Sequence, residues 1–397
     1  MMISCMISQS ARADEIPESF HPVRSNAMGG ASTAIANDEN TMWTNPAGIS
    51  RIRKARNRGG IHLIKFPNVI VGGNAASKSF YSGLQAKSDE DSVDEIASSS
   101  KDLSNKPFWA LTSIFPMMMA DVGGIPMAGG FFTHTTMKAV EDKEVAGQAS
   151  AEIISDVGGV GGIALTNDSN RFSFGLQARY IGRYAYQENL PIATLVDKGE
   201  MQTELKDKSN KSKAIAFDVG ALWTLADFWF PTVGAAVLNV PTGCKSDYLN
   251  PFSKLRENVC GTKFSGDFAN EDAISVLDPT DIRFGVSITP RLSRKLATRI
   301  GIDVHHFHVN SGGANYGLSE IPLQKTIHVG MEVFIGNPLL PSPFSVMVGG
   351  SQGYYTMGAS VRLGFLALDV ATFGRDISNN DAPDEDRRYM GGISGSF

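Results

Sequence analysis

The chain has 397 residues, of which 42% are hydrophobic and 19% are charged, and it contains 41 glycines. This composition favours many strands and tight turns and argues against a helix bundle. The formal net charge of −5 argues against a nucleic-acid-binding protein, since Lys and Arg are dispersed except in the run from Arg51 to Arg58. No stretch approaches the ~20 consecutive apolar residues of a transmembrane helix, so a membrane location would require a closed β-barrel.

Residues 1–13 are predicted to be a signal peptide. Met1 to Ile7 is a short apolar run, and Ala11-Arg12-Ala13 is a small-residue cleavage site before Asp14. The alternative is a lipoprotein signal, in which Met2-Ile3-Ser4 precedes a lipidated Cys5. The cleavage site after Ala13 already explains the segment, so we favour the signal peptide.

The segment from Asn26 to Gly48 is compact and punctuated by glycine. Gly29 and Gly30 follow Met28 and permit a tight backbone turn. Small residues follow from Ala31 to Ala36, and they could pack closely against a wall of strands. Trp43-Thr44-Asn45-Pro46-Ala47-Gly48 ends in a second turn, because Pro46 fixes φ.

Alternation of apolar and polar residues dominates the remaining chain. Between Arg171 and Tyr186, one parity carries large apolar side chains such as Phe172 and Leu176, and the other carries Gln177, Arg179 and Arg183. A period of two residues indicates a strand with one apolar and one polar face. Charges deep on the polar parity and aromatics at strand ends favour a membrane barrel with a watery lumen over a soluble sandwich.

About fourteen strands are expected, the even number that is typical of bacterial barrels. Most connections after even-numbered strands are short and most after odd-numbered strands are long, as in barrels whose short turns face the periplasm. Residues 117–125 and 336–342 are expected to form turns of middling length. The expected strands are 59–74, 107–116, 126–137, 149–165, 171–186, 212–226, 230–240, 281–289, 296–308, 324–335, 343–351, 354–363, 365–375 and 387–397.

Two long connections carry further features. Residues 88–103 form either a short amphipathic helix or a solvated acidic loop. Cys244 and Cys260 are the two cysteines left after cleavage, and they lie in one polar connection. A cysteine pair in a secreted chain is read as a disulfide, with two free thiols as the alternative.

No residue pattern predicts catalysis, a metal site or a cofactor. In His305-His306-Phe307-His308, two histidines share a strand face and the third points away, which is too few ligands for zinc. His305 shares the lumen face with Asp303, and the two can pair. No Gly-x-Ser-x-Gly motif occurs, and no Cys–His constellation in the mature chain suggests a nucleophile. We therefore do not expect an enzyme.

The last strand ends in an aromatic residue. Tyr389, Ile393 and Phe397 share one parity, and this pattern resembles the C-terminal signature by which outer-membrane barrels are recognised for assembly. An ordinary edge strand is the alternative.

The N-terminal motifs resemble the hatch of the FadL-like outer-membrane transport protein superfamily. The superfamily includes long-chain fatty-acid and aromatic-hydrocarbon uptake channels and the TraF-like and PorV-like barrels. The similarity rests on Met28-Gly29-Gly30, on Ala36-Asn37-Asp38 and on the Trp43 to Gly48 stretch, and it extends to residues 353–364 and 386–389. The resemblance implies an all-β, transmembrane antiparallel barrel with a small helical plug in its lumen. The predicted domains are therefore a signal peptide (1–13), a hatch or plug (14–56) and the barrel (57–397).

The resemblance implies passive uptake of hydrophobic small molecules, such as long-chain fatty acids, in the outer membrane of a Gram-negative cell, with a lateral opening in the wall. The alternative is a non-transporting barrel that serves secretion or envelope assembly, and a barrel enzyme has little support. The charged lumen and the lack of a clear apolar pocket depart from the uptake pattern. The expected partners are outer-membrane lipid, the barrel assembly machinery and a hydrophobic small molecule.

Overall fold

The computed structural model describes most of the strands, the plug and part of the connections. The described residues are 20, 22–52, 60–77, 107–141, 148–167, 169–191, 194, 198–249, 256–267, 277–305, 323–336, 342–377 and 384–397. The expected signal peptide, the lipobox alternative and the 88–103 segment lie outside them.

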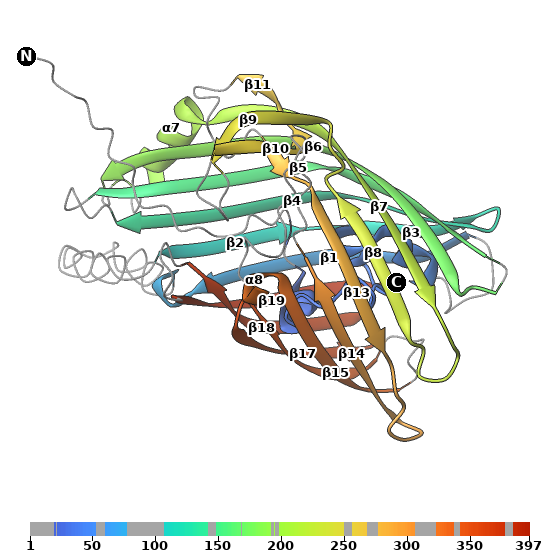
Figure 1. Cartoon of the computed structure of the whole chain (residues 1–397). Coiled ribbons are helices and arrows are strands. Elements are labelled where there is room, and N and C mark those ends of the chain that lie inside the picture. The colour runs from blue at the N-terminus through green and yellow to red at the C-terminus, as the bar shows by residue number, and fades with distance from the viewer. Residues whose placement is uncertain are drawn as a thin grey trace, which may run out of the picture.

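Antiparallel strands form a closed barrel (Figure 1). The wall consists of β1 (Gly60–Asn74), β2 (Phe108–Ile114), β3 (Met117–Val122), β4 (Ile125–Glu141), β5 (Gln148–Thr166), β6 (Phe172–Pro191), β7 (Asn210–Thr224), β8 (Thr232–Leu238), β13 (Asp281–Ile288), β14 (Leu296–Val304), β15 (Ile327–Ile335), β16 (Phe344–Ser351), β17 (Tyr354–Leu363), β18 (Leu366–Asp376) and β19 (Glu385–Ser396).

The barrel closes where the last strand pairs with the first. β1 pairs with β19 on one side and with both β2 and β3 on the other, and β3 and β2 both pair with β4. β2 and β3 are thus two halves of one wall strand. Counted this way, the described wall has fourteen strands, as the sequence predicts.

The two barrel ends differ, two expected bounds are corrected, and one helix is present where a loop is expected. Short turns gather at one end and long connections at the other (Figure 1). Residues 117–122 form strand β3 rather than a turn, and the turn is Gly123-Gly124. Residues 324–326 belong to helix α8 (Leu323–Thr326) instead of strand β15, and helix α7 (Lys198–Lys208) lies within the expected loop 187–211.

The outer surface of the barrel is apolar. On β6, the outward Phe172, Leu176 and Tyr180 are exposed, and the inward Gln177 and Arg179 are buried. The same alternation recurs on other long strands, as expected for lipid outside and polar groups inside. Exposed aromatics lie near both strand ends and form the two interfacial girdles; they include Phe172, Trp223, Phe344, Phe365, Phe397, Tyr184, Tyr355 and Tyr389.

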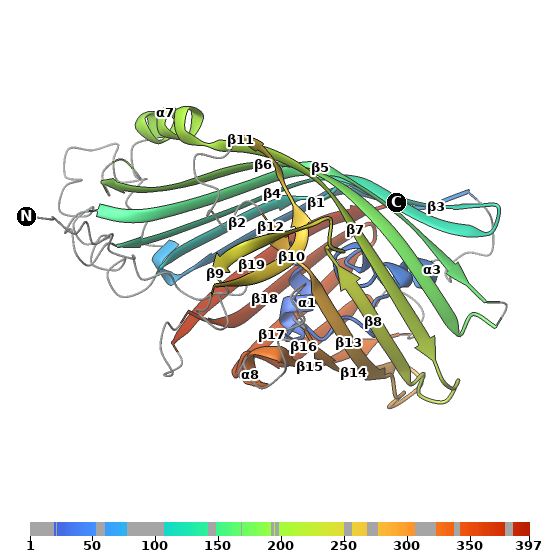
Figure 2. The ribbon, with the colours of Figure 1, turned by 45° about the horizontal axis from the view of Figure 1, so that its top comes forward.

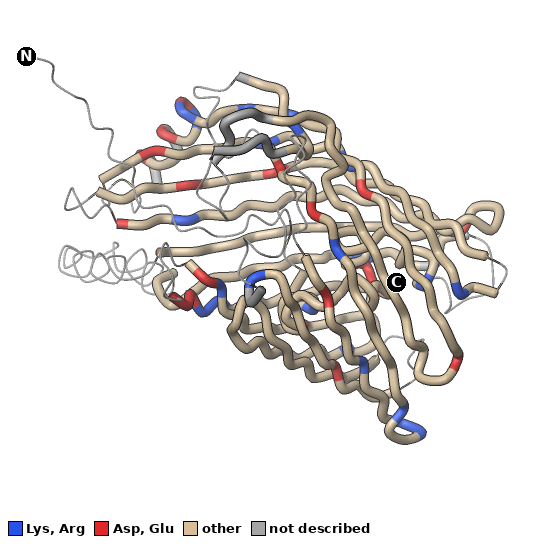
Figure 3. The backbone as a smooth tube through the Cα atoms, viewed as in Figure 1, with Lys and Arg blue, Asp and Glu red and all other residues tan. Residues whose placement is uncertain are grey.

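These features define an outer-membrane barrel, whose short turns face the periplasm. Within the described part of the chain, no helix is long and apolar enough to cross a membrane. Charged positions occur within the strands as well as at the turns (Figure 3). Since the outward faces are apolar, the charges within the strands point mostly into the lumen.

The N-terminal segment lies inside the barrel. Both ribbon views show it enclosed by strands (Figures 1 and 2). It consists of α1 (Val23–Ala27), α2 (Thr41–Thr44), the 3-10 turn η1 (Pro46–Gly48) and α3 (Ile49–Ile52). Residues 22–52 are referred to below as the plug.

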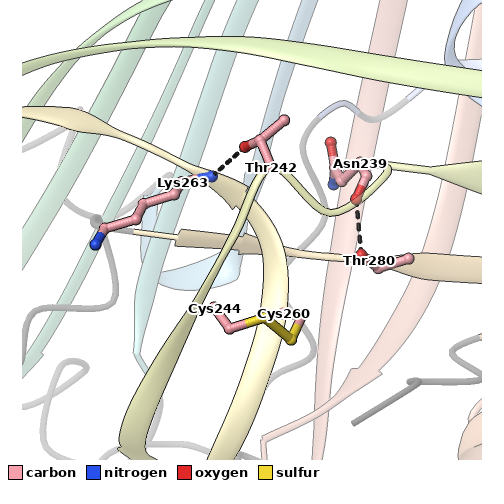
Figure 4. The surroundings of a disulfide bond; sticks show 6 residues. All are labelled: Asn239, Thr242, Cys244, Cys260, Lys263 and Thr280. Carbon is pink, nitrogen blue, oxygen red and sulfur yellow. Dashed lines mark hydrogen bonds between the residues drawn. A yellow bond between two sulfur atoms is a disulfide. The ribbon is translucent and has the colours of Figure 1, made fainter. Parts of the chain in front are cut away.

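A small sheet lies in the long connection between β8 and β13. It contains β9 (Gly243–Leu249), β10 (Arg256–Lys263) and β12 (Leu277–Pro279), and the short β11 (Ser265–Asp267) extends the wall beside β7. A disulfide joins Cys244 of β9 to Cys260 of β10, which lie opposite each other in the ladder (Figure 4). Thr280 donates a hydrogen bond to the Asn239 carbonyl, which holds the two ends of the connection together.

Candidate functional site

Asn45 fastens the plug to the wall. Its side chain is fully buried, and its amide Nδ2 donates to the carbonyl oxygens of Thr33 at 2.9 Å, Ala221 at 3.2 Å and Ala235 at 3.3 Å. Its Oδ1 accepts from the Ala47 backbone N–H at 3.1 Å. A single side chain thus joins two plug segments to strands β7 and β8, which explains why an amide is needed at this position.

Glycines on the inner wall let the plug lie directly against the backbone of the strands. At nine described wall positions, an added Cβ would fall within 3.2 Å of a plug atom. A Cβ at Gly220, for example, would meet the Oδ1 of Asn45, and one at Gly175 would meet the backbone of Pro46. We call this set the glycine belt; its members are Gly162, Gly175, Gly220, Gly234, Gly285, Gly301, Gly330, Gly349 and Gly358.

The predicted Met28-Gly29-Gly30 turn also lies against the belt. Gly29 and Gly30 have φ of 64° and 90°, which non-glycine residues rarely adopt. A Cβ on Gly29 would come within 2.5 Å of the Gly350 carbonyl oxygen, and Met28 occupies the space beside Gly330 and Gly349. This turn therefore requires glycine for both its conformation and its close contact with the wall.

Charged groups add a second set of links between the plug and the wall. Arg24 of α1 donates to Glu332 of β15 at 2.6 Å and to Asp38 of the plug at 2.6 Å. Arg299 of β14 donates to the same Glu332 oxygen at 2.6 Å. Burial opposes the charge of Arg24, yet Glu332 and Asp38 hold the pKa of its guanidinium above the ordinary value.

The predicted pairing of Asp303 and His305 is present beside the plug loop that contains Ser32 and Thr33. His305 Nε2 lies 3.4 Å from Asp303 Oδ2, and that oxygen also accepts from the Ser32 and Thr33 N–H groups at 2.8 and 2.6 Å. Asp303 therefore holds the plug loop as well as the histidine. His306 and His308 lie outside the described residues.

A Ser–His pair does not form a catalytic arrangement. His328 Nδ1 lies 2.7 Å from the Gly29 carbonyl oxygen and 3.1 Å from Ser351 Oγ. A carbonyl oxygen only accepts, so Nδ1 carries the proton and cannot take one from Ser351. The described residues also contain no group of three or more His, Cys, Asp or Glu side chains that could hold a metal ion.

Aromatic and sulfur-containing side chains separate the plug from the remaining wall. Trp43 stacks on Phe20 with ring centroids 4.2 Å apart, and it meets Phe115 and Phe132 edge-on at 5.3 and 5.2 Å. The buried cluster continues along β1 to β4, β16, β18 and β19. At these positions the wall carries large side chains, whereas the glycine belt carries none. The cluster, called the aromatic side below, includes Phe20, Trp43, Ile70, Trp109, Leu111, Phe115, Met117, Met119, Phe132, Met347, Phe373 and Met390.

The wall ladder is interrupted beside the aromatic side. The register of β1 shifts between Lys65 and Asn68, and opposite it Phe115 and Pro116 separate β2 from β3. Pro116 has no N–H to give to the ladder. Asn68 partly bridges the interruption, because its Nδ2 donates to the Phe115 carbonyl at 3.0 Å and its carbonyl accepts from Phe115 N at 2.9 Å.

A cavity of about 700 Å³ lies on the short-turn side of the plug. Its charged lining includes Arg24, Arg51, Lys65, Arg299 and Arg362 together with Asp38, Glu39, Glu332 and Asp369, and its apolar lining includes Ile35, Ile52 and Leu63. Turn residues 169–171 also line it, which places its mouth at the periplasmic end.

Besides Arg24, two plug groups in this cavity have shifted pKa values. Burial raises the pKa of the Glu39 carboxyl, but its ion pair with Lys65 outweighs burial, and the net pKa lies below the ordinary value. Burial and the nearby Arg299 lower the pKa of Arg51 to about 10. Arg51 still remains charged at neutral pH.

On the long-connection side, buried charges are paired. Arg179 forms a two-pronged pair with Asp218 at 2.9 Å for both contacts, and Arg183 contacts both Asp156 of β5 and Asp278 of β12 at 2.7 Å. Arg183 also lies over the Phe264 ring at 4.1 Å. The β9–β10–β12 sheet is thereby docked onto the inner wall. The charged lumen expected from the sequence is present, and its arginines here mainly hold protein parts together.

The other predicted site residues lie where their patterns suggest. Pro46 and Ala47 are buried against β6 and β7, and Gly48 packs against Thr41 and Ala36 inside the plug. Tyr389, Ile393 and Phe397 are exposed on the outer face of the last strand, and Phe397 stacks on Phe365 at 5.5 Å. Their role in assembly stays a prediction.

No sequence pattern predicts the aromatic side. Its members come from the plug and from several wall strands, so no local pattern joins them. Pro116, which follows Phe115 in an otherwise apolar strand, and Pro67 in β1 are local signals of a wall irregularity.

Fold, plug and apolar exterior together define the class as a plugged fourteen-strand outer-membrane barrel. Two solved structures share this fold over nearly their whole length. The toluene transporter TodX from Pseudomonas putida has a TM-score of 0.51 at 9% identity, and 96% of this chain covers 98% of that one. The toluene transporter TbuX from Ralstonia pickettii has a TM-score of 0.50 at 13% identity, with the same coverage.

These similarities confirm the predicted FadL-like resemblance at the level of the fold. No protein-family model matches the sequence, and no curated protein matches it either. The similarity to these transporters therefore rests on the fold alone.

Proposed function

We propose that this barrel mediates passive uptake of hydrophobic small molecules through the outer membrane, along the aromatic side of the plug. The observation that carries the proposal is the asymmetry of the plug contacts. On the glycine-belt side, plug atoms lie directly on the wall backbone, and no molecule can pass without breaking those contacts. On the aromatic side, side chains fill the space, and side chains can change rotamer without moving the backbone.

The interrupted ladder supports a lateral route. The aromatic side borders the wall at Phe115, where β1 and β2–β3 lose their regular pairing. A hydrophobic molecule that leaves the lumen here would enter the membrane beside the periplasmic cavity, which Asn68 and Ile70 also line, and would not have to leave through the mouth of that cavity. Long-chain fatty acids and small aromatic hydrocarbons both suit an apolar path, and the two structures that share the fold are described as toluene transporters.

Uptake in whole cells tests the proposal. A Gram-negative host that lacks its own such barrel would express the chain, and entry of labelled toluene and labelled oleate would be followed. Trp43→Ala should change the uptake rate of at least one compound severalfold, because it removes the centre of the aromatic side. Trp223→Ala is the matched control, since Trp223 lies on the outer face. No uptake above the empty host for either compound would refute the proposal.

An accessory role in secretion or envelope assembly is the second candidate. It is favoured by the way the lumen is filled, since the plug and the docked β9–β10–β12 sheet occupy both its middle and its long-connection side. A barrel that copurifies with a stoichiometric protein partner and moves neither compound would support this role.

A further inference from the structure

Arg51 is a charged side chain that the proposed uptake route does not use. It projects from α3 into the 700 Å³ periplasmic cavity, and its Nη2 donates to the Thr224 hydroxyl at 2.9 Å. Among the described residues, Arg51 contacts no carboxylate. Three other cations that line the cavity differ in this respect, because Lys65 pairs with Glu39, and Arg24 and Arg299 share Glu332.

The surroundings of Arg51 are unfavourable for a guanidinium without a counterion. Arg299 is close enough to repel it, and burial removes part of its hydration. The sequence offers no nearby acid either, since residues 52–59 add four cations and no carboxylate. A half-buried cation beside a second cation is stabilised by an anion that contacts both.

Hydroxyl groups complete the same corner of the cavity. Thr224 Oγ1, which accepts from Arg51, lies 3.0 Å from Thr232 Oγ1, and Ser287 and Thr289 line the cavity on the neighbouring strand. Two guanidinium groups and several hydroxyls match the acceptor oxygens of a carboxylate or a phosphate group.

We propose that this corner of the periplasmic cavity is an oxyanion-binding site, in which Arg51 and Arg299 hold a carboxylate or phosphate group beside the hydroxyls of Thr224 and Thr232. The site lies on the opposite side of the plug from the β9–β10–β12 sheet, and it does not depend on the uptake route. The anion arrives from the periplasm, either free or as the head of an amphiphile whose tail lies along Ile35 and Ile52.

Isothermal titration calorimetry on the full chain in a non-ionic detergent tests the site. Inorganic phosphate is the free-anion probe and octyl phosphate the amphiphile probe, both at low ionic strength. We expect saturable binding, and loss of a charge-assisted contact in Arg51→Gln should weaken it roughly tenfold or more. Tighter binding of octyl phosphate would identify the anion as the head of an amphiphile, and equal binding would identify a free anion.

Arg171→Gln is the matched control. It removes the same charge at the mouth of the same cavity, where Arg171 is exposed and pairs with Asp227. Its affinity should stay within about twofold of the native chain, because an exposed ion pair contributes little. Thr224→Val keeps all charges and should weaken binding severalfold, which preserves the test if Arg51→Gln does not fold. Absence of saturable binding by either probe, or equal weakening in Arg51→Gln and Arg171→Gln, would overturn the proposal.

Discussion

Replacing Asn45 by Ala should loosen the plug without unfolding the barrel. The side chain supplies two N–H groups to three carbonyl oxygens and one acceptor to Ala47, so the substitution removes about three hydrogen bonds. At roughly 1 kcal/mol of net stability each, the docked state loses about 3 kcal/mol. The ratio of undocked to docked plug should therefore rise by roughly two orders of magnitude.

Planar-bilayer conductance measures this directly. Asn45→Ala should show frequent open events, while the heat-modifiable gel mobility that reports an intact barrel should not change. Asn40→Ala is the matched control, because it removes the same amide from the plug and no side-chain hydrogen bond of Asn40 is present in the described structure. If Asn45→Ala is as silent as Asn40→Ala, the amide does not hold the plug.

Four further changes have definite expected outcomes. Gly175→Val should expose the plug to protease from the periplasmic side, since its Cβ meets Pro46, whereas the outward Gly161→Val should not. Phe397→Ser should lower outer-membrane levels on immunoblots, and native levels would refute the assembly signal. Deletion of residues 26–50 should leave a folded but conducting barrel, and a silent deletion would mean that they are no plug. Cys260→Ser should speed proteolysis within the β9–β10–β12 sheet and leave barrel mobility unchanged.

Alternation was enough to predict the wall because lipid and lumen impose opposite demands on neighbouring residues. Strand β6 illustrates this, since the outward Leu176 is exposed and the inward Gln177 is buried as predicted. Strand β3 was missed because Pro116 breaks the pattern and ended the expected strand, although the chain resumes pairing at Met117. The β9–β10–β12 sheet has no lipid-facing side and therefore no alternating signal.

Of the contact between the plug and the wall, the sequence predicts only the plug residues. The sequence singles out Asn45 and the Gly29-Gly30 turn, but their partners are glycines on distant strands, such as Gly220 and Gly350. The sequence shows which glycines lie on the inward parity of a strand. It does not show which plug segment packs against each of them. Helix α7 was missed for a related reason, since it is polar on all sides apart from residues such as Met201, which lies in one buried cluster with Tyr186.

The distribution of glycine around the lumen assigns different roles to the two halves of the wall. Strands β5 to β8 and β13 to β17 meet the plug with glycine, so any displacement there must separate plug atoms from a wall backbone that carries no side chain at the contact. Strands β1 to β4 meet it through Phe115, Phe132 and other large side chains, whose rotamers can change individually. A plug fixed on one side and bordered by adjustable side chains on the other can admit a small apolar molecule without leaving the barrel. In the proposed mechanism, therefore, the hatch stays in place during uptake and the aromatic side acts as the gate.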